Sequence, residues 1–502
     1  MSAQVLIAGA GPTGLTLGID LARRGIAVRI VDAAETFFDG SRGDGLQPRT
    51  LEVFHDLGVL DAVLAAGAPQ APMRVHLGGE FAGERRMTEW REPTPDIPYP
   101  NGWVLGQSDT EGVLRERLAE FGVKVESATA LTGFTADDGG VTATLTHHGG
   151  TEEVRADYLI GADGGRSTVR RTLGIAFEGT TDESIRMLLG DVRADALDHS
   201  YGYWFAEPDA PMEGFAMSPL PGGRKFQFAA PLSGDSGADL EVLQDYVHRL
   251  SRRTDIVLSD LTWSTVWRPN IRLAERFRVG RVFLAGDAAH AHPPTGGQGL
   301  NTGVQDAYNL GWKLAAALRD PGEESEALLD TYETERRAVA AKVLGLSSEI
   351  LDKTVNGDAD AMSREGTDQL DISYRNLLSH SDPVSHSIAD DGALQAGDRA
   401  PDAPLTTGTG EKVSLFELFR GPHATLLVFG GTPDETDSSD PGRSAALPAT
   451  QIRVVSIAGP DAEPAEGILV DAGGHAHRAY SATPGTRALV RPDGYLALLT
   501  RP

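Results

Sequence analysis

Short apolar runs alternate with stretches of helical spacing near the start of the chain and again near its middle. Residues 4–8, 28–31, 158–161 and 282–285 are dominated by apolar side chains, as expected for buried strands. The segment from 300 to 318 repeats its apolar residues at helical intervals. This order of strands, turns and helices predicts an open α/β sheet, whose ligands bind beyond the carboxyl ends of the strands.

A different period dominates residues 174–274, where apolar residues alternate with polar ones as in antiparallel strands. Prolines between positions 93 and 100 predict a surface loop or cover within residues 73–106. A polar, acidic stretch at 352–395 has the composition of a connector. Apolar runs return from 397 onward, as in a small α/β unit.

These changes of pattern predict a chain of several parts. The predicted parts are a discontinuous cofactor-binding domain (1–72, 101–174 and 275–351), a substrate sheet domain (73–100 and 175–274), a helical connector (352–396) and a C-terminal unit (397–502).

The amino-acid composition excludes several classes of function for this protein. The 502 residues include 45 Lys and Arg against 72 Asp and Glu, a net charge of −27, which repels nucleic acids and anionic membrane surfaces. The chain has no cysteine, which excludes disulfides, thiolate catalysis and cysteine-ligated metals. No apolar stretch approaches a membrane span and no cationic leader precedes the first apolar run. We therefore expect a soluble cytoplasmic protein without a metal centre.

The turn after the first apolar run has the spacing GxGxxG. Its glycines allow a tight turn, close approach to a pyrophosphate, and packing of a helix on a strand. The second strand ends in Asp32, at the distance where a dinucleotide fold places its ribose-binding carboxylate. This order of strand, glycine turn, helix, strand and carboxylate predicts a dinucleotide site, but it does not distinguish FAD from NAD. The candidate residues of the turn are Gly9, Gly11, Pro12, Thr13 and Gly14.

A second candidate stretch spans residues 281–306. Its strand ends in a Gly-Asp pair, so a carboxylate lies just beyond the strand. A glycine-rich loop then leads into a helix, whose free N–H groups and positive dipole end suit an anionic or electron-rich ring. The candidate cofactor contacts here are Gly286, Asp287, Gly297, Gly299, Leu300 and Asn301.

This second stretch resembles the GD motif of the FAD-dependent aromatic hydroxylases, the single-component monooxygenases of the para-hydroxybenzoate hydroxylase and phenol hydroxylase type. The GxGxxG turn, a DG segment at 162–170 and the GD stretch occur along the chain in the same order as in that family. The resemblance implies that Asp287 binds the FAD ribose and that Pro294 lines the reaction site. It also implies that the amides of Leu300 and Asn301 face the flavin, which makes these two residues and Pro294 the catalytic candidates.

The same resemblance suggests further cofactor contacts. It implies that Arg42 lies near the pyrophosphate, that Gln107 contacts FAD, and that Asp163 of the DG motif serves the diphosphate region. The C-terminal unit resembles the thioredoxin-like tail of phenol hydroxylase and of polyketide hydroxylases. Since it lacks cysteine, we expect it to serve stability or dimer contact and not dithiol chemistry.

The implied fold is therefore α/β and α+β: a Rossmann-like FAD-binding domain interleaved with an antiparallel-sheet substrate domain, plus a C-terminal thioredoxin-like domain, in a monomer or homodimer. The chain is most similar to the aromatic polyketide hydroxylases of antibiotic biosynthesis. The resemblance implies noncovalent FAD, reduction by NADPH, and reaction with O2 to a flavin C4a-hydroperoxide that hydroxylates a polycyclic aromatic polyketide.

Other functions fit the same scaffold. Baeyer–Villiger oxygenation, antibiotic-inactivating hydroxylation and a non-catalytic FAD-fold binding protein remain open, while a flavin halogenase is disfavoured because its WxWxIP motif is absent. No residue that deprotonates the substrate is identified. His290 and His292 adjoin the GD motif, but loop histidines beside a cofactor motif are more often structural, and we leave them out of the catalytic set.

Aromatic side chains of the sheet domain share faces because a strand has a period of two. They either wall a pocket for a flat substrate or form core against helices. The pocket candidates are Tyr203, Phe205, Phe215, Met217, Phe226 and Phe228.

Overall fold

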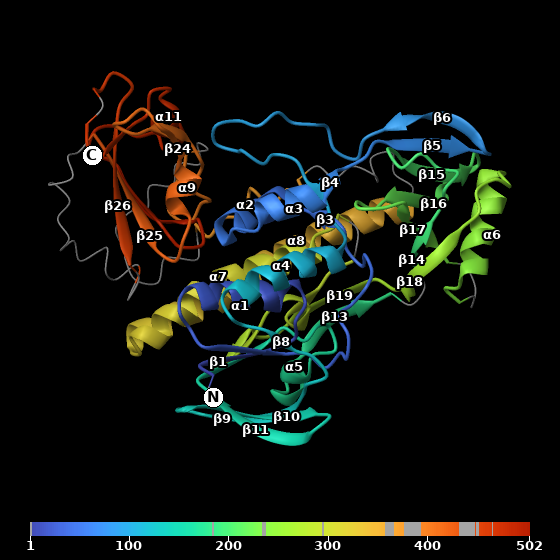
Figure 1. The fold of residues 1–502 in the computed structure, drawn as a ribbon, viewed down its shortest axis with the longest axis horizontal. Coiled ribbons are helices and arrows are strands. Elements are labelled where there is room, and N and C mark those ends of the chain that lie inside the picture. The colour runs from blue at the N-terminus through green and yellow to red at the C-terminus, as the bar shows by residue number, and fades with distance from the viewer. Residues whose placement is uncertain are drawn as a thin grey trace.

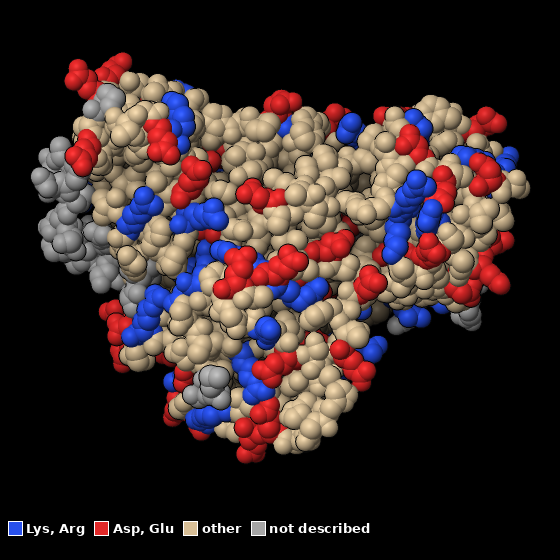
Figure 2. Space-filling view, viewed as in Figure 1, with Lys and Arg blue, Asp and Glu red and all other residues tan. Residues whose placement is uncertain are grey.

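Long helices separate the two ends of the molecule in Figure 1, where the C-terminal unit and the substrate sheet lie on opposite sides of the picture. The computed structural model describes residues 3–182, 185–232, 237–293, 296–356, 366–375, 393–430, 447, 451–463 and 465–502. Among these residues, no helix is long and apolar enough to cross a membrane. Figure 2 shows Lys and Arg side chains interspersed with Asp and Glu over this face, so the net negative charge does not gather there in one patch.

The cofactor-binding part is built on a six-stranded sheet of order β20-β21-β12-β1-β2-β8. All neighbouring pairs are parallel except β20 with β21. The parallel strands bring their carboxyl ends to one edge, as predicted for a ligand site. The strands are β1 (Val5–Ala8), β2 (Val28–Val31), β8 (Val125–Glu126), β12 (Tyr158–Gly161), β20 (Arg278–Val279) and β21 (Val282–Leu284).

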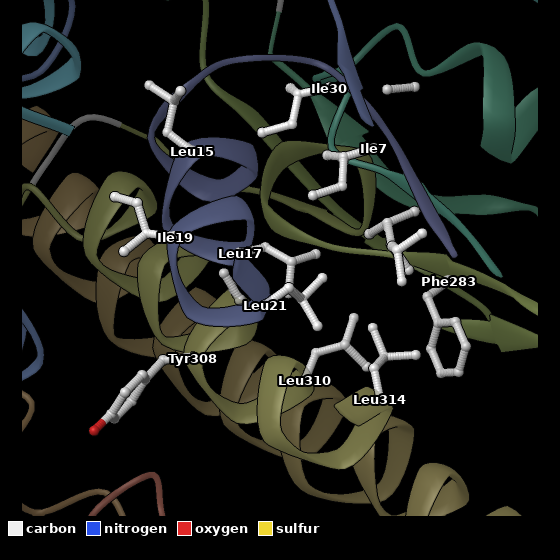
Figure 3. Packing of buried hydrophobic residues seen from close by; sticks show 14 of the residues in the cluster. Ile7, Leu15, Leu17, Ile19, Leu21, Ile30, Phe283, Tyr308, Leu310 and Leu314 are labelled. Atoms are coloured by element: carbon white, nitrogen blue, oxygen red, sulfur yellow. The ribbon is translucent and has the colours of Figure 1, made fainter. Parts of the chain in front are cut away.

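Helices α1 (Pro12–Arg23), α4 (Gln107–Glu120) and α7 (Gly299–Arg319) pack beside this sheet. Figure 3 shows Leu17 and Leu21 of α1 between Ile7 of the sheet and the α7 residues Leu310 and Leu314. The close approach of α1 to β2 needs a glycine at position 18, because a Cβ on Gly18 would lie 2.4 Å from Cδ1 of Ile30. The turn at residues 9–14, helix α1 and strand β2 therefore form one packed unit.

Smaller elements complete this part. They are the meander β9 (Ala130–Asp137), β10 (Gly140–His147) and β11 (Gly150–Ala156), the sheet β3 (Gly45–Leu46), β7 (Trp103–Val104) and β4 (Ala68–Pro69), the sheet β13 (Phe177–Thr181), β19 (Asn270–Ala274) and β22 (His290–Ala291), the helices α2 (Pro48–Leu57), α3 (Leu60–Ala66), α5 (Thr168–Thr172) and α8 (Glu323–Asn356), and the 3-10 turn η1 (Gly286–Ala288).

The substrate sheet has seven strands in the order β18-β14-β17-β16-β15-β5-β6, and helix α6 (Leu240–Ser251) packs against it. Two of its strands come from the segment just before the proline-rich loop. The strands are β5 (Met73–Leu77), β6 (Glu80–Arg85), β14 (Met187–Arg193), β15 (Gly202–Glu207), β16 (Ala210–Pro219), β17 (Lys225–Pro231) and β18 (Ser259–Trp267).

The pocket interpretation of the aromatic faces is wrong, and their side chains form core. All six pocket candidates are buried in one cluster together with Leu243 and Val247 of α6. The register pairs them across strands on a single face, and that face packs against the helix. The opposite face of these strands lies toward a cavity, because successive side chains of a strand point to opposite faces and Gly202, Ser218 and Gln227 line that cavity. The misassigned residues are Tyr203, Phe205, Phe215, Met217, Phe226 and Phe228.

The C-terminal unit holds a seven-stranded mixed sheet of order β24-β23-β27-β26-β25-β28-β29. Helix α9 (Leu415–Phe419) begins at a capping box in which Ser414 and Glu417 satisfy each other's backbone N–H groups. The thioredoxin-like character of this unit stays a prediction, and the predicted connector lies largely outside the described residues. The remaining elements are β23 (Pro404–Thr406), β24 (Lys412–Ser414), β25 (Ala424–Phe429), β26 (Ile452–Ala458), β27 (Ile468–Val470), β28 (Arg487–Val490), β29 (Leu496–Thr500) and α11 (His475–Ala479).

A buried ion cluster joins this unit to α7 and α8. The Glu335 carboxylate accepts hydrogen bonds from Lys313 Nζ at 2.9 Å and from both terminal nitrogens of Arg491 at 2.8 Å. Although burial alone would raise the pKa of Glu335, these two cations hold it well below its ordinary value. Trp312 adds an apolar contact to the C-terminal sheet. The C-terminal unit is therefore part of the same packed body.

Replacing Glu335 by Ala would leave the charges of Lys313 and Arg491 buried without their shared carboxylate. Removing one partner of such a buried group costs about 3–5 kcal/mol. We expect a marked fall in the urea midpoint, followed by tryptophan fluorescence. Glu324→Ala on the exposed surface of α8 is the control and should change stability by less than about 0.5 kcal/mol. Equal midpoints for the two variants would contradict a structural role for the cluster.

Candidate active site

A first cavity of about 770 Å³ opens at the carboxyl ends of β1, β2 and β12. Most of the predicted cofactor residues meet there, although they come from seven separate places along the chain. The predicted residues that line this cavity are Gly9, Gly11, Pro12, Thr13, Asp32, Arg42, Gln107, Asp163, Asp287, Gly299 and Leu300.

The glycines of the first turn divide into two kinds. Gly9 has φ +105°, and a Cβ on it would lie 2.2 Å from the carbonyl oxygen of Ala162. A Cβ on Gly14 would lie 2.0 Å from the carbonyl oxygen of Gly9. A Cβ on Gly11 would meet no protein atom within 4 Å, although Gly11 lines the cavity. Gly9 and Gly14 therefore serve the fold, and Gly11 leaves room for a ligand.

Backbone N–H groups orient two of the cavity's carboxylates. Asp32 accepts hydrogen bonds from the N–H groups of Ala10 and Ala34, both at 2.8 Å. Oδ2 of Asp163 accepts from the N–H of Thr168 at 2.6 Å, whereas its Oδ1 is buried without a partner among the described residues. Since a buried acceptor without a donor is costly, the Asp163 position fits a ligand that donates a hydrogen bond.

The GD turn contacts the first turn directly. Gly286 has φ +59°, and a Cβ on it would lie 2.5 Å from Oγ1 of Thr13. Asp287 is exposed and lines the first cavity. Enclosure by the protein raises the pKa of Asp287 because desolvation outweighs the attraction of His290 and Arg42. A hydroxyl donor such as a ribose would stabilise this carboxylate, in line with the predicted role.

Arg42 and Gln107 also line the first cavity. The Arg42 guanidinium lies 4.1 Å from the ring centroid of Phe38, which also lines the cavity. Gln107 is the first residue of α4, and its amide donates to Glu111 Oε1 at 2.8 Å. Both side chains lie where the resemblance places contacts to FAD, and their roles stay predictions.

Not every predicted contact lines the first cavity. The Asn301 side chain donates to the carbonyl oxygen of Gly45 at 2.8 Å and accepts from the N–H of Gln47 at 2.8 Å, so it ties residues 45–47 to α7. Gly297 lines a second cavity instead. Pro294 lies outside the described residues, and its predicted place at the reaction site is untested.

The second cavity, of about 760 Å³, lies between the substrate sheet and the start of α7. Glycine, alanine and proline supply much of its wall. The sheet contributes Gly202, Ser218 and Gln227, which alternate with the buried aromatic residues. Sequence reasoning missed these residues, although the period of two identifies them once the aromatic face is known to be core.

A buried hydrogen-bonded chain supports the turn between the cavities. Nε2 of His292 lies 2.9 Å from Nδ1 of His290, whose Nε2 lies 2.6 Å from Oδ2 of Asp306. Asp306 also accepts from Arg336 Nε at 2.7 Å and from the N–H of Gly286 at 3.0 Å. Burial alone would raise the pKa of Asp306, but His290 and Arg336 lower it. The GD turn is therefore attached to α7 and α8 by an ionised carboxylate.

Comparisons with known proteins agree with this arrangement. The family described as FAD binding domain matches residues 2–347, and the one described as aromatic-ring hydroxylase, C-terminal, matches residues 394–501. A flavin-dependent monooxygenase of Mycobacteroides abscessus is 44% identical over 99% of this chain and 97% of its own length. The 6-methylpretetramide 4-monooxygenase of Streptomyces rimosus is 35% identical over 98% of this chain and 90% of its own length.

A solved structure extends the comparison to the fold. The ternary complex of aklavinone-11 hydroxylase with FAD and aklavinone has a TM-score of 0.79 and 27% identity, covering 99% of this chain and 95% of that chain. The open space beside Gly11 and the unpaired Oδ1 of Asp163 both fit FAD, the first as room for a pyrophosphate and the second as an acceptor for a hydroxyl.

Gly11→Ala tests the first cavity without disturbing the fold. Its Cβ meets no protein atom, so the apoprotein should unfold at the wild-type urea concentration. The same methyl group would crowd a pyrophosphate at a cost of about 1–3 kcal/mol, which raises the FAD dissociation constant by about 5- to 150-fold. Fluorescence titration measures that constant. Gly133→Ala on β9 also meets no atom within 4 Å and is the control. Wild-type FAD affinity in Gly11→Ala would remove the pyrophosphate from this position.

Proposed function

Because this chain belongs to the family of FAD-dependent aromatic-ring hydroxylases, we propose that it hydroxylates a phenol-bearing polycyclic aromatic substrate of the polyketide type. NADPH is the proposed reductant, and O2 the proposed source of the oxygen atom. A role in antibiotic biosynthesis stays a prediction.

The observation that carries this proposal is the pairing of two cavities along the same two segments. Arg42 lines the cavity that fits FAD, whereas Asp44 lines the second cavity. At the start of α7, Gly299 and Leu300 line the first cavity, whereas Gly297, just before the helix, lines the second. A ring system bound in the second cavity would therefore adjoin the flavin end of the first.

The size and wall of the second cavity favour a large flat substrate. Its 760 Å³ lies in the upper part of the usual range for ligand pockets, about 300–1,000 Å³. Many of its lining residues are small and project little into the cavity. The indole of Trp103 adds an aromatic surface. Two relatives carry 6-methylpretetramide and aklavinone in their names, which supports a substrate of this kind.

FAD, when bound, supplies the activation of O2 with electrons from NADPH. The chain's own residues bind and orient the reactants. The N-terminus of α7 presents the N–H groups of Leu300 and Asn301, and its dipole favours negative charge nearby. The substrate sheet and both residues of β3 line the second cavity and would limit access of water to the reacting ring.

Substrate stimulation of NADPH oxidation tests this function. The purified FAD-loaded protein should oxidise NADPH slowly alone and faster with multi-ring phenols, because an occupied second cavity is needed for productive turnover. The rate is followed by the absorbance of NADPH against a panel of one-ring and multi-ring phenols. Stimulation by one-ring phenols alone would contradict the polycyclic assignment, and no stimulation by any aromatic compound would favour a non-catalytic FAD-binding protein.

FAD should be bound noncovalently, since the chain has no cysteine to form a thioether. Acid precipitation of the yellow protein should release the colour into the supernatant. Colour that remains with the pellet would show a covalent link.

A further inference from the structure

The proline-rich loop, residues 91–101, is continuous with the wall of the second cavity. Both of its flanking segments, residues 86–88 and 102–104, line that cavity. In Figure 1 the chain after β6 extends from the substrate sheet toward the C-terminal unit and then turns back. A displacement of this loop would therefore move part of the wall against which a ligand binds.

Hydrogen bonds within the loop make it an ordered unit. At its base, the N–H of Arg91 donates to Oδ1 of Asn101 at 2.9 Å, and Nδ2 of Asn101 donates to the carbonyl oxygen of Arg91 at 2.6 Å. Near its tip, the N–H groups of Thr94 and Ile97 donate to each other's carbonyl oxygens at 3.1 and 3.2 Å. The Arg91 guanidinium also binds the Asp368 carboxylate at 3.0 Å, which attaches the base.

The tip of the loop is held by the C-terminal unit. The carbonyl oxygen of Asp96 accepts hydrogen bonds from the N–H of Asp402 at 3.3 Å and from Nη2 of Arg399 at 3.0 Å. Nε of Arg399 also donates to the two carboxylate oxygens of Glu52 on α2, at 2.9 and 2.8 Å. The side chains of Arg399 and Glu52 are only 9% and 2% exposed. One buried guanidinium therefore joins the C-terminal unit, the proline-rich loop and α2.

Glu52 orients this guanidinium and is itself fixed from a second direction. Nη1 of Arg49 donates to its carboxylate at 2.6 Å. Although burial alone would raise the pKa of Glu52, Arg399 and Arg49 hold it below its ordinary value. Helix α2 begins at Pro48, directly after residues 44–47, which also line the second cavity. Arg399 thus connects two separate segments of the cavity wall.

We propose that Arg399 is a positioning residue for the second cavity. By holding the proline-rich loop, it keeps residues 86–88 and 102–104 packed against a bound aromatic substrate, which excludes water from the reacting ring. The C-terminal unit would then take part in turnover as well as in stability. This inference rests on the proposed function.

The fate of the electrons from NADPH reports on such a wall. In coupled turnover, the two electrons and two protons reduce one atom of O2 to water while the other atom enters the ring. When the wall is loose, the same electrons and protons convert both atoms to hydrogen peroxide. The ratio of peroxide formed to NADPH oxidised therefore measures how well the cavity is closed around the substrate.

Arg399→Gln removes the charged link and leaves Glu52 paired with Arg49. Arg478→Gln is the matched control, because Arg478 is an exposed arginine of α11 in the same unit and donates to the nearby carbonyl oxygen of Gly473 at 2.8 Å. Arg399→Lys keeps a positive charge beside Glu52 without the planar fork of a guanidinium, and it replaces the Gln variant if that protein does not retain FAD.

Two measurements on the FAD-loaded proteins are independent of hydroxylation. Limited trypsin cleavage after Arg86 and Arg91, followed by mass spectrometry, should be several-fold faster in Arg399→Gln, because cleavage follows the population of the open loop. The dissociation constant of the four-ring phenol 1-hydroxypyrene, measured by equilibrium dialysis, should rise about fivefold to tenfold, as expected for loss of a charged hydrogen bond that holds the wall. Arg478→Gln should match wild type in both.

Turnover with a substrate found in the phenol panel separates positioning from a general loss of structure. In Arg399→Gln, KM for the phenol and the peroxide ratio should rise, while the FAD dissociation constant and kcat for NADPH oxidation stay near those of wild type. Arg399→Lys should give an intermediate peroxide ratio. An unchanged peroxide ratio in Arg399→Gln, or a loss of FAD affinity and kcat together with the rise in KM, would overturn the assignment.

The remaining outcomes distinguish this inference from the proposed function. If cleavage and probe binding change as predicted but wild type hydroxylates no phenol, Arg399 positions the cavity wall and the hydroxylase proposal is wrong. If wild type hydroxylates phenols and Arg399→Gln does so with equal KM and peroxide ratio, the hydroxylase stands and the role of Arg399 is wrong. Equal trypsin cleavage in wild type and Arg399→Gln would show that the loop is held without this residue, which also overturns its role.

Discussion

The buried carboxylate of Asp306 is the interaction on which the rest of the site depends. It lies on α7 and binds three partners at once: the N–H of Gly286, the ring of His290 and the guanidinium of Arg336 on α8. These contacts fix the GD turn beside the first cavity and the loop that continues toward the second. Because Arg336 is itself buried, loss of the carboxylate would leave an unpaired charge in the interior, and both cavities would lose their common support.

Helices α7 and α8 carry this support to the far side of the molecule. Arg336 attaches α8 to the GD turn, whereas the adjacent Glu335 binds Lys313 and Arg491 and so holds the C-terminal unit. The helices thus act as one scaffold between the C-terminal sheet and the cofactor cavity (Figure 1). A C-terminal unit without cysteine contributes through this attachment, which is consistent with a role in stability.

Local patterns predicted the cofactor part well because its signals lie close together in sequence. The turn at residues 9–14 and the GD stretch each combine strand, glycine loop and helix within a short segment, and most of their residues line one cavity. The substrate cavity was not predictable in the same way. A period of two separates two faces of a strand but does not say which one packs against a helix. The place of residues 44–47 in the wall of the second cavity depends on contacts between segments far apart in the sequence, such as Ser41 with Asp191, which no local pattern predicts. Asp306 lies on α7, whose residues 301–317 are all buried, and sequence reasoning did not single out this carboxylate.

We propose that the protein transfers an oxygen atom from O2 to a phenolic ring held in the second cavity. The most direct test is product analysis by mass spectrometry after turnover under isotopically heavy O2, with a multi-ring phenol, NADPH and the FAD-loaded protein. The account predicts a product that carries one heavy oxygen atom on an aromatic carbon of the intact ring system. A product without the label, or a ring opened by oxygen insertion beside a carbonyl group, would contradict it.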